Sequence, residues 1–299
     1  MGNILKGYLQ LCRPPNLPTA AADIVAGLAL AGFFAQGSGG PFLRFEDAMA
    51  IVLVLASVLL YAGGVVLNDV FDAALDKVER PERPIPKGIV PVKDAFFFGT
   101  VLLLLGVVLS FFVGELHGGI AVLLALAIVS YDKFSKQHHF FGPLNMGVCR
   151  GLNLLLGMAY LGSFTNALYC LIPVFYIFAI TRVSQGEVHG ENKKSIALAG
   201  ILYVFVILFV IVLNHSLGTV GNAYFYFLLI FGAAVFIPLR IAYRNNGPLQ
   251  IKNAVKAGVL SLILLDATMA VAHSSWTVGV LIVLLLPLSI LLSRIFAVT

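Results

Sequence analysis

Long apolar runs separated by short polar segments dominate the sequence. Runs of roughly 20 apolar residues that do not alternate with a period of two predict helices that cross a membrane. The ten runs are Leu17–Phe34, Ala48–Leu67, Ala95–Val113, Gly118–Tyr131, Leu144–Leu161, Ala167–Val183, Ile196–Leu213, Ala223–Ile241, Ala254–Ala272 and Trp276–Phe296. The fourth run is short, and the last two could form one re-entrant pair. The pattern therefore predicts an all-α, polytopic transmembrane bundle of nine to ten spans.

The composition supports a membrane protein. Hydrophobic residues make up 60% of the chain and charged residues only 11%, whereas soluble domains carry about 25% charged residues. In lipid every backbone polar group must be bonded internally, which favours helices over open sheets. No soluble domain or low-complexity linker stands out, so residues 1–299 are predicted to form a single integral-membrane domain. The net charge of +5 forms no basic, aromatic-interleaved face, so no nucleic-acid partner is expected.

The basic residues predict an orientation in the membrane. If the ten runs all cross, every one of the 19 Lys and Arg residues except Arg44 lies on the side of the N-terminus. Basic residues collect in cytoplasmic loops. The N-terminus and the polar segments that follow the second and sixth runs are therefore predicted to be cytoplasmic.

Three acidic residues close the second apolar run. Asp69, Asp72 and Asp76 are spaced i, i+3 and i+7, which places them on one face of a helix. Carboxylates stacked in this way need cations or water between them. Mg²⁺ shared between carboxylate and phosphate oxygens is the usual chemistry of such a cluster. A solvated helix end, paired with Lys77 and Arg80, is the alternative.

A basic segment with three prolines follows the acidic face, from Arg80 to Gly88. Proline restricts the backbone, so Arg83 and Lys87 can be presented with little loss of conformational entropy. Fixed cations beside a metal-binding acidic face suit a diphosphate, because the metal bridges its oxygens and the cations neutralise the remaining charge.

The two segments together resemble the first signature of the UbiA superfamily of intramembrane prenyltransferases. The matching positions are Asn68, Asp69, Asp72, Asp76, Arg80, Arg83, Pro84 and Gly88. The alternation of runs and loops resembles the family along essentially the whole chain. The resemblance implies a UbiA-like fold that transfers a prenyl group, with Mg²⁺, from an allylic prenyl diphosphate to a hydrophobic, aromatic or lipid-type acceptor in the bilayer and releases diphosphate.

The family also carries a second acidic motif after the sixth span, usually two aspartates four residues apart. This chain has Glu187 and Glu191 at that spacing, with Gly190 between them. The longer glutamate side chains and a shorter following segment resemble an EboC-like branch. Without the resemblance, the two residues would be an ordinary acidic pair at a membrane surface. The resemblance implies the following catalytic residues, all but Asn68 as Mg²⁺ ligands: Asn68, Asp69, Asp72, Asp76, Glu187 and Glu191.

Further polar residues end the fourth run or lie within the fifth. Lysines at a helix end are also explained by anchoring at the cytoplasmic surface, whereas an arginine inside a span is costly unless it is paired or faces water. The predicted substrate-binding residues are Arg80, Arg83, Lys87, Tyr131, Lys133, Lys136, Arg150 and Asn153. Asp23 and Asp266 are lone carboxylates within apolar runs, and no specific role is predicted for them.

Two other functions are compatible with the sequence. The glutamates of the second motif suggest a non-catalytic family member that binds or transports a prenylated or aromatic precursor. A secondary transporter is the third hypothesis, but broken helices with polar groups near mid-membrane would be expected for it. Here the polar clusters lie at the predicted surface, which favours the prenyltransferase.

Overall fold

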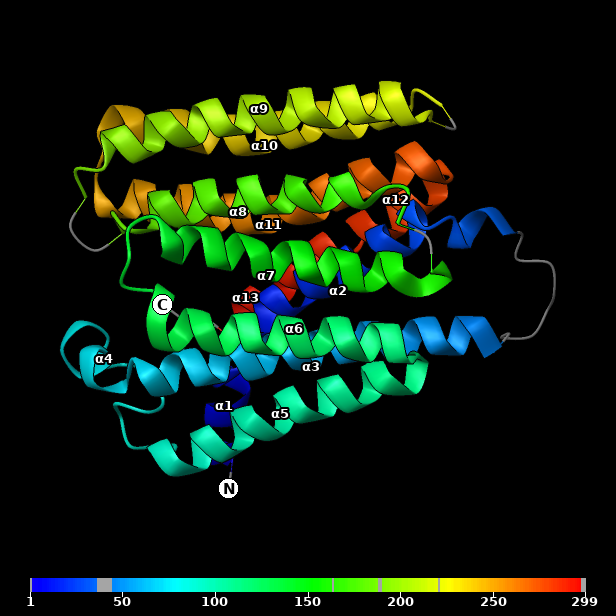
Figure 1. The fold of residues 1–299 in the computed structure, drawn as a ribbon. Coiled ribbons are helices and arrows are strands. Elements are labelled where there is room, and N and C mark those ends of the chain that lie inside the picture. Colours follow the sequence, from blue (N-terminus) through cyan, green and yellow to red (C-terminus); the bar gives the residue numbers. More distant parts are fainter. Residues whose placement is uncertain (1, 37–44, 163, 188–189, 220, 297–299) are drawn as a thin grey trace.

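The computed structural model describes residues 2–36, 45–162, 164–187, 190–219 and 221–296, and within these ranges the regular secondary structure is entirely helical (Figure 1). The elements in chain order are α1 (Gly2–Leu11), the 3₁₀ turns η1 (Pro14–Asn16) and η2 (Phe33–Gln36) on either side of α2 (Leu17–Leu30), α3 (Phe45–Phe71), α4 (Ala73–Glu79), α5 (Val92–Val113), α6 (Glu115–Ser130), the π-helical turn η3 (Tyr131–Ser135), α7 (Phe141–Met158), the 3₁₀ turns η4 (Ala159–Leu161) and η5 (Ala167–Cys170), α8 (Leu171–Ser184), α9 (Lys193–Leu217), α10 (Tyr224–Asn245), α11 (Pro248–His273), α12 (Trp276–Val283) and α13 (Leu285–Ile295).

The predicted all-α transmembrane bundle is confirmed. Among the described residues, eight helical segments are long and apolar enough to cross a membrane, against nine to ten predicted. The two predicted spans outside this set are α2, which has only 14 residues, and α7, whose 18 residues include Arg150 and Asn153. Both are helical where the sequence predicts helices. They differ from the other spans because one is short and the other carries polar residues toward the interior.

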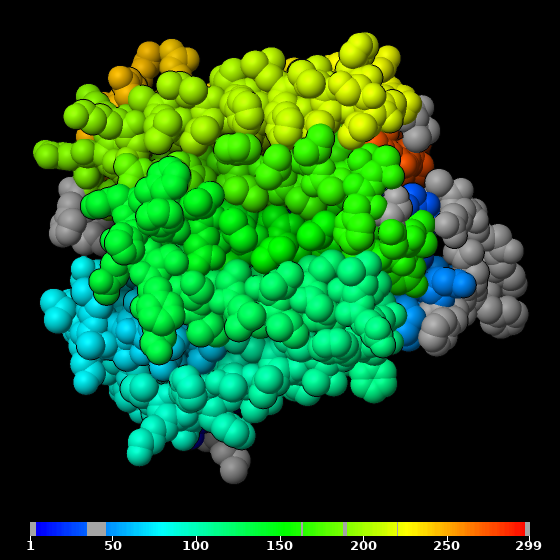
Figure 2. Space-filling view, in the orientation of Figure 1, coloured from blue at the N-terminus to red at the C-terminus, as the bar shows by residue number. Residues whose placement is uncertain are grey.

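The helices run roughly alongside one another, with α9 and α10 at one edge and α5 at the opposite edge (Figure 1). Helix α11 is central: 72% of its most apolar stretch is buried, against 22% for that of α5. Large apolar side chains such as Phe97, Phe112, Ile201 and Leu229 are exposed on the outer helices. Figure 2 shows side chains filling the space between neighbouring helices on one face. An apolar exterior around a closely packed interior is the arrangement that a bilayer requires.

Two glycines bring α2 and α7 into close contact. A Cβ atom at Gly27 would lie 2.5 Å from the carbonyl oxygen of Leu154, and one at Gly157 would lie 2.6 Å from that of Ile24. Small residues at such crossings let helix backbones approach in membranes. Since any larger residue would separate the helices, this contact fixes how the polar side chains of α2 and α7 meet.

The polar segments of the two acidic motifs lie at the same end of the bundle. The short helix α4 and the end of α8 are found together at one side of Figure 1. The fourth apolar run is longer than predicted, because α6 continues into the π-helical turn η3. Such turns alter the direction of side chains within a helix. Here η3 comes directly before Lys136, which reaches toward α3.

Candidate functional site

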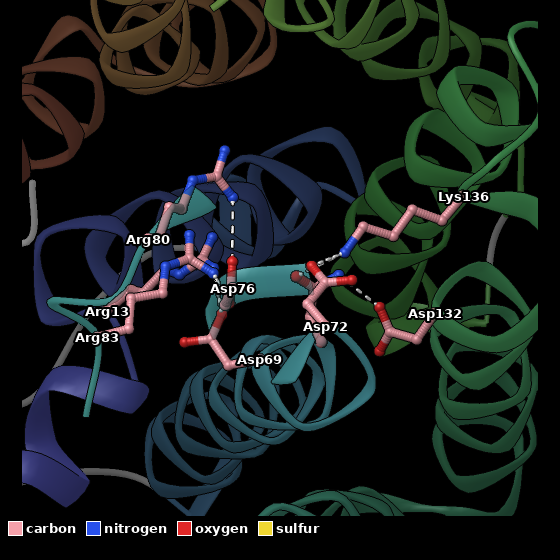
Figure 3. A network of polar contacts seen from close by, with 9 residues as sticks. Arg13, Asp69, Asp72, Asp76, Arg80, Arg83, Asp132 and Lys136 are labelled. Atoms are coloured by element: carbon pink, nitrogen blue, oxygen red, sulfur yellow. Dashed lines mark hydrogen bonds and ion pairs between the residues drawn. The ribbon is translucent and has the colours of Figure 1, made fainter. Parts of the chain in front are cut away.

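The first acidic motif spans the junction of α3 and α4. Although α3 ends at Phe71, the backbone N–H of Asp72 donates to the carbonyl of Asn68 at 3.0 Å, and that of Asp76 donates to the carbonyl of Asp72 at 2.8 Å. The acidic residues thus keep nearly helical spacing. Their side chains are nevertheless held from two sides, because Asp69 and Asp76 meet arginines whereas Asp72 meets a lysine (Figure 3).

Arginines neutralise the two buried carboxylates. Nη1 of Arg83 donates to Oδ1 of Asp69 at 3.0 Å and to Oδ2 of Asp76 at 2.6 Å. Nη2 of Arg13 donates to the same Oδ1 of Asp69 at 2.6 Å, and Arg80 lies 3.7 Å from Oδ1 of Asp76. Asp69 and Asp76 are only 5% and 1% exposed. Buried carboxylates at this depth require such partners.

Lys136 and Asp132 lie on the other side of the motif (Figure 3). Lys136 forms an ion pair with Asp72 and donates to Oδ1 of Asn68 at 3.1 Å. Nδ2 of Asn68 donates in turn to Oδ1 of Asp132 at 2.7 Å. The network therefore joins α3 to the end of α6 and places Lys136 beside the acidic motif.

Lys87 and Lys133, the other predicted cations of the site, make no described ion pair with the acidic motif. Lys87 and Lys133 are exposed, and Nζ of Lys133 lies over the ring of Phe134, 5.2 Å from its centroid. Tyr131 is partly buried and lies within electrostatic range of Asp72. The structure thus brings Arg80, Arg83, Lys136 and Tyr131 to the acidic motif but leaves Lys87 and Lys133 outside the described network.

The two glutamates of the second motif lie in different environments. Glu187 is partly buried, and burial raises the pKa of its carboxyl while Arg80 and Lys252 act to lower that pKa. It therefore lies within electrostatic range of the first motif. Glu191 is exposed, has a left-handed backbone (φ 56°), and its N–H donates to the carbonyl of Asn246 at 3.2 Å. No described contact joins the Glu191 carboxylate to the first motif.

Arg150 and Asn153 belong to a different cluster. Nε of Arg150 lies 2.8 Å from Oδ2 of Asp23, and Nδ2 of Asn153 donates to the same oxygen at 2.8 Å. The structure thus supplies partners for Asp23, whereas Oδ2 of the buried Asp266 has no hydrogen-bond partner.

Two members of the network, Arg13 and Asp132, are not among the site residues predicted from the sequence. Arg13 has a left-handed backbone (φ 48°) immediately before Pro14, a position where proline favours extended conformations. Such an outlier at a polar cluster is a functional signal. It is visible only in the structure, whereas the position of Asp132 beside Tyr131 was available from the sequence.

The donor chemistry of the site fits Mg²⁺. Carboxylate and amide oxygens are its usual ligands, and Oδ1 of the buried Asp76 has no hydrogen-bond partner. In the described ranges no three His, Cys, Asp or Glu side chains converge on one point, because Arg83 and Lys136 lie among the carboxylates. The metal-binding role of Asp69, Asp72, Asp76 and Glu187 therefore stays a prediction.

Replacing Lys136 tests this arrangement. Lys136→Gln is expected to raise the KM for an allylic diphosphate about tenfold to a hundredfold, because a hydrogen bond to a charged group is worth roughly 1.5–3 kcal/mol. Steady-state kinetics of diphosphate release would measure it. Lys133→Gln is the matched control, since it removes an exposed lysine from the same turn. Equal effects of the two substitutions would contradict a specific role for Lys136.

The fold and the site define a class of protein: a polytopic helical membrane protein with an acidic, cation-lined site at one end of the bundle. The model of the UbiA prenyltransferase family matches residues 25–252. The chain belongs to this family, as its first motif predicts, and the enzyme class expected from the sequence is that of the family, prenyltransferase.

Several relatives are named digeranylgeranylglyceryl phosphate synthase. The one from Methanosarcina mazei is 31% identical over 202 residues, covering 66% of this chain and 68% of the relative. Those from Methanococcoides burtonii and Methanoregula boonei are 35% and 36% identical, covering 53% and 60% of this chain. The chain spans 56% and 60% of the lengths of these two relatives.

Solved structures share the fold. One, from a study of digeranylgeranylglyceryl phosphate synthase in membranes, has a TM-score of 0.67 and 22% identity over 91% of this chain and 99% of that one. A UbiA homologue from Archaeoglobus fulgidus bound to GPP and Mg²⁺ has a TM-score of 0.60 and 13% identity over 88% of this chain and 99% of its own. At these identities the likeness concerns the fold alone.

Proposed function

We propose that this chain transfers a prenyl group from an allylic prenyl diphosphate to the hydroxyl group of a glycerol-type lipid, with Mg²⁺, and releases diphosphate. The observation that carries the proposal is the acidic network of Asp69, Asp72 and Asp76, paired with Arg13, Arg83 and Lys136 at one end of an apolar bundle. The names of its relatives support a glycerol-type acceptor over an aromatic one.

The cations of the site have two successive partners in this mechanism. Without substrate, Arg13 and Arg83 hold Asp69, and Lys136 holds Asp72. With a diphosphate bound, Arg13, Arg83 and Lys136 would turn to its oxygens, and Asp69, Asp72 and Glu187 would be the residues that hold Mg²⁺. Bound Mg²⁺ would neutralise the diphosphate and ease cleavage of its bond to C1 of the prenyl group.

One bond forms and one bond breaks in the proposed reaction. The acceptor oxygen forms a bond to C1 of the donor, the C1–O bond to the diphosphate breaks, and the leaving group keeps the electron pair. The hydroxyl proton passes to the departing diphosphate. Arg83 and Lys136 stabilise the charge that develops on it, as positioned donors do in other group transfers. The prenyl chain lies along the apolar interior, outside bulk water.

We also propose that the site faces the cytoplasm. The basic residues of the chain gather with the acidic motifs on one predicted side, and this asymmetry is the usual mark of the cytoplasmic face. The assignment suits the chemistry, because a water-soluble diphosphate product leaves most easily from a site that opens to an aqueous compartment.

The test is diphosphate release by the purified protein in detergent, with C10 to C20 allylic diphosphates and an alkylglycerol phosphate as acceptor. We expect release that requires Mg²⁺, stops with EDTA, and yields a product heavier by one prenyl group. Tight, Mg²⁺-dependent donor binding without release would support the non-catalytic alternative. Absence of both binding and release would reject the proposed function.

A further inference from the structure

The turn that follows α6 places two opposite charges beside the first acidic motif. Asp132 lies within η3 and Lys136 directly follows it, and both extend toward the motif from the same side of the site (Figure 3). Asp132 is only 8% exposed. Since burial of a carboxylate is costly, the contacts that hold Asp132 indicate what this residue does. The simplest alternative to a functional role is a structural tie between α3 and the end of α6.

The π-helical geometry of η3 sets how the two charges are used. Residues four apart on an α-helix, with the acid first, commonly form a direct ion pair. Here the backbone N–H of Lys136 donates to the carbonyl of Tyr131 at 3.0 Å, five residues earlier, so the turn is wider than that of an α-helix. Among the described contacts no ion pair joins Asp132 to Lys136. Their side chains instead meet the two ends of one amide, that of Asn68.

Asp132 determines the orientation of that amide. Nδ2 of Asn68 donates to Oδ1 of Asp132 at 2.7 Å, and Oδ1 of Asn68 accepts from Nζ of Lys136 at 3.1 Å. A carboxylate only accepts hydrogen bonds, whereas an amide both donates and accepts. The donor end of Asn68 must therefore face Asp132, which leaves its acceptor end for the ammonium group of Lys136.

This contact costs more than a structural tie requires. Oδ2 of Asp132 is buried and has no hydrogen-bond partner among the described residues, and an unsatisfied buried acceptor is unfavourable. A neutral side chain could join α3 to η3 without that cost. What a neutral amide or hydroxyl cannot supply is a group that accepts from Asn68 and never donates to it.

We propose that Asp132 is a positioning residue, which acts through Asn68 to hold Lys136 at the acidic motif. Lys136 is thereby anchored at two oxygens, Oδ1 of Asn68 and the carboxylate of Asp72. The inference rests on the proposed function and deepens it. As Lys136 turns from Asp72 to a bound diphosphate, its contact with Asn68 would keep the ammonium group close to the leaving group. Asp132 itself does not touch the reacting atoms.

The reactivity of Lys136 tests this positioning without donor, acceptor or metal. The purified protein in detergent is treated with trace acetic anhydride, and acetylation of each lysine is measured by mass spectrometry, with the exposed Lys133 as internal reference. Asp132→Ala is expected to raise the relative rate at Lys136 about threefold or more, because the amide that holds the ammonium group is then free to turn. Asp132→Asn keeps the shape but adds a donor, so an intermediate rate is expected.

A double-mutant cycle separates positioning from a structural tie. Asp132→Ala is expected to raise the KM for an allylic diphosphate about three- to tenfold in the wild-type background. In a Lys136→Gln background it should change the KM little, because the group on which Asp132 acts is already gone. Equal factors in the two backgrounds, or an unchanged rate of acetylation at Lys136, would overturn the inference.

Ser135→Ala is the matched control. Ser135 belongs to the same turn, and its hydroxyl contacts the carbonyl of Ser130 and the side-chain amide of Asn145. Acetylation of Lys136 and the KM should stay close to those of the wild type. A rise equal to that of Asp132→Ala would assign the effect to a general loosening of η3 and overturn the inference. Failure of the proposed function would appear instead as absent Mg²⁺-dependent donor binding, and the acetylation rates then decide the inference alone.

Discussion

Asp72→Ala is expected to lower Mg²⁺-dependent diphosphate release by about a hundredfold or more, because a carboxylate that holds the metal at the leaving group acts directly on the reacting bond. Asp72 is the member of the first motif that no arginine holds in the described network. Its partner is Lys136, whose side chain is 27% exposed, so we expect it to be the carboxylate most readily released to a metal.

Comparison with Glu79→Ala makes the Asp72 result specific. Glu79 is an exposed acid at the end of the short helix α4, which begins directly after Asp72, so its removal changes the net charge equally. We expect near-normal release from Glu79→Ala. If the two variants released diphosphate at the same rate, Asp72 would have no part in metal binding, and the assignment of the first motif would fail.

Arg83→Ala is expected to destabilise the protein by about 3–5 kcal/mol, the usual cost of removing one partner of a buried ion pair. Arg83 is 9% exposed and bridges Asp69 and Asp76, so its loss leaves two buried carboxylates short of positive charge. Thermal unfolding in detergent would measure the effect. Added Mg²⁺ should stabilise the variant more than the wild type, because the uncovered carboxylates can then bind it.

Lys87→Ala is the control for the Arg83 variant, since Lys87 belongs to the same loop but is exposed. Its unfolding temperature should stay close to that of the wild type. An Arg83→Ala protein as stable as the wild type and indifferent to Mg²⁺ would show that Asp69 and Asp76 neither depend on this arginine nor form part of a metal site.

The sequence predicts the helices well because a helix that crosses a bilayer needs a long apolar run. It overestimates the length of α2, which has 14 residues and is followed by a turn at Phe33–Gln36. The short fourth run of the sequence is also longer in the structure, because polar Tyr131 and Asp132 lie inside a continuing π-helical turn. Local hydropathy cannot show that a helix continues through polar residues which find partners in the fold.

The sequence predicts only those parts of the site whose residues lie close together in the chain. The spacing of Asp69, Asp72 and Asp76 identifies them from the sequence alone. The contact of Arg13 with Asp69 spans 56 residues, and that of Asn68 with Asp132 spans 64. Such contacts depend on how helices pack.

The contact of Asp23 with Arg150 illustrates the same limit. Asp23 and Arg150 stand alone in their apolar runs, and they meet because α2 and α7 approach closely at Gly27 and Gly157. No spacing within either run encodes that meeting. The assignment of residues 1–299 to a single domain stays a prediction, and so do the catalytic, substrate-binding and metal-binding roles of the site residues.

The ion pairs of the first motif neutralise its carboxylates with cations that belong to the same chain. Arg13, Arg83 and Lys136 compensate the carboxylates from within the chain, so biogenesis does not have to wait for a divalent ion, unlike domains whose folding energy comes from their metal.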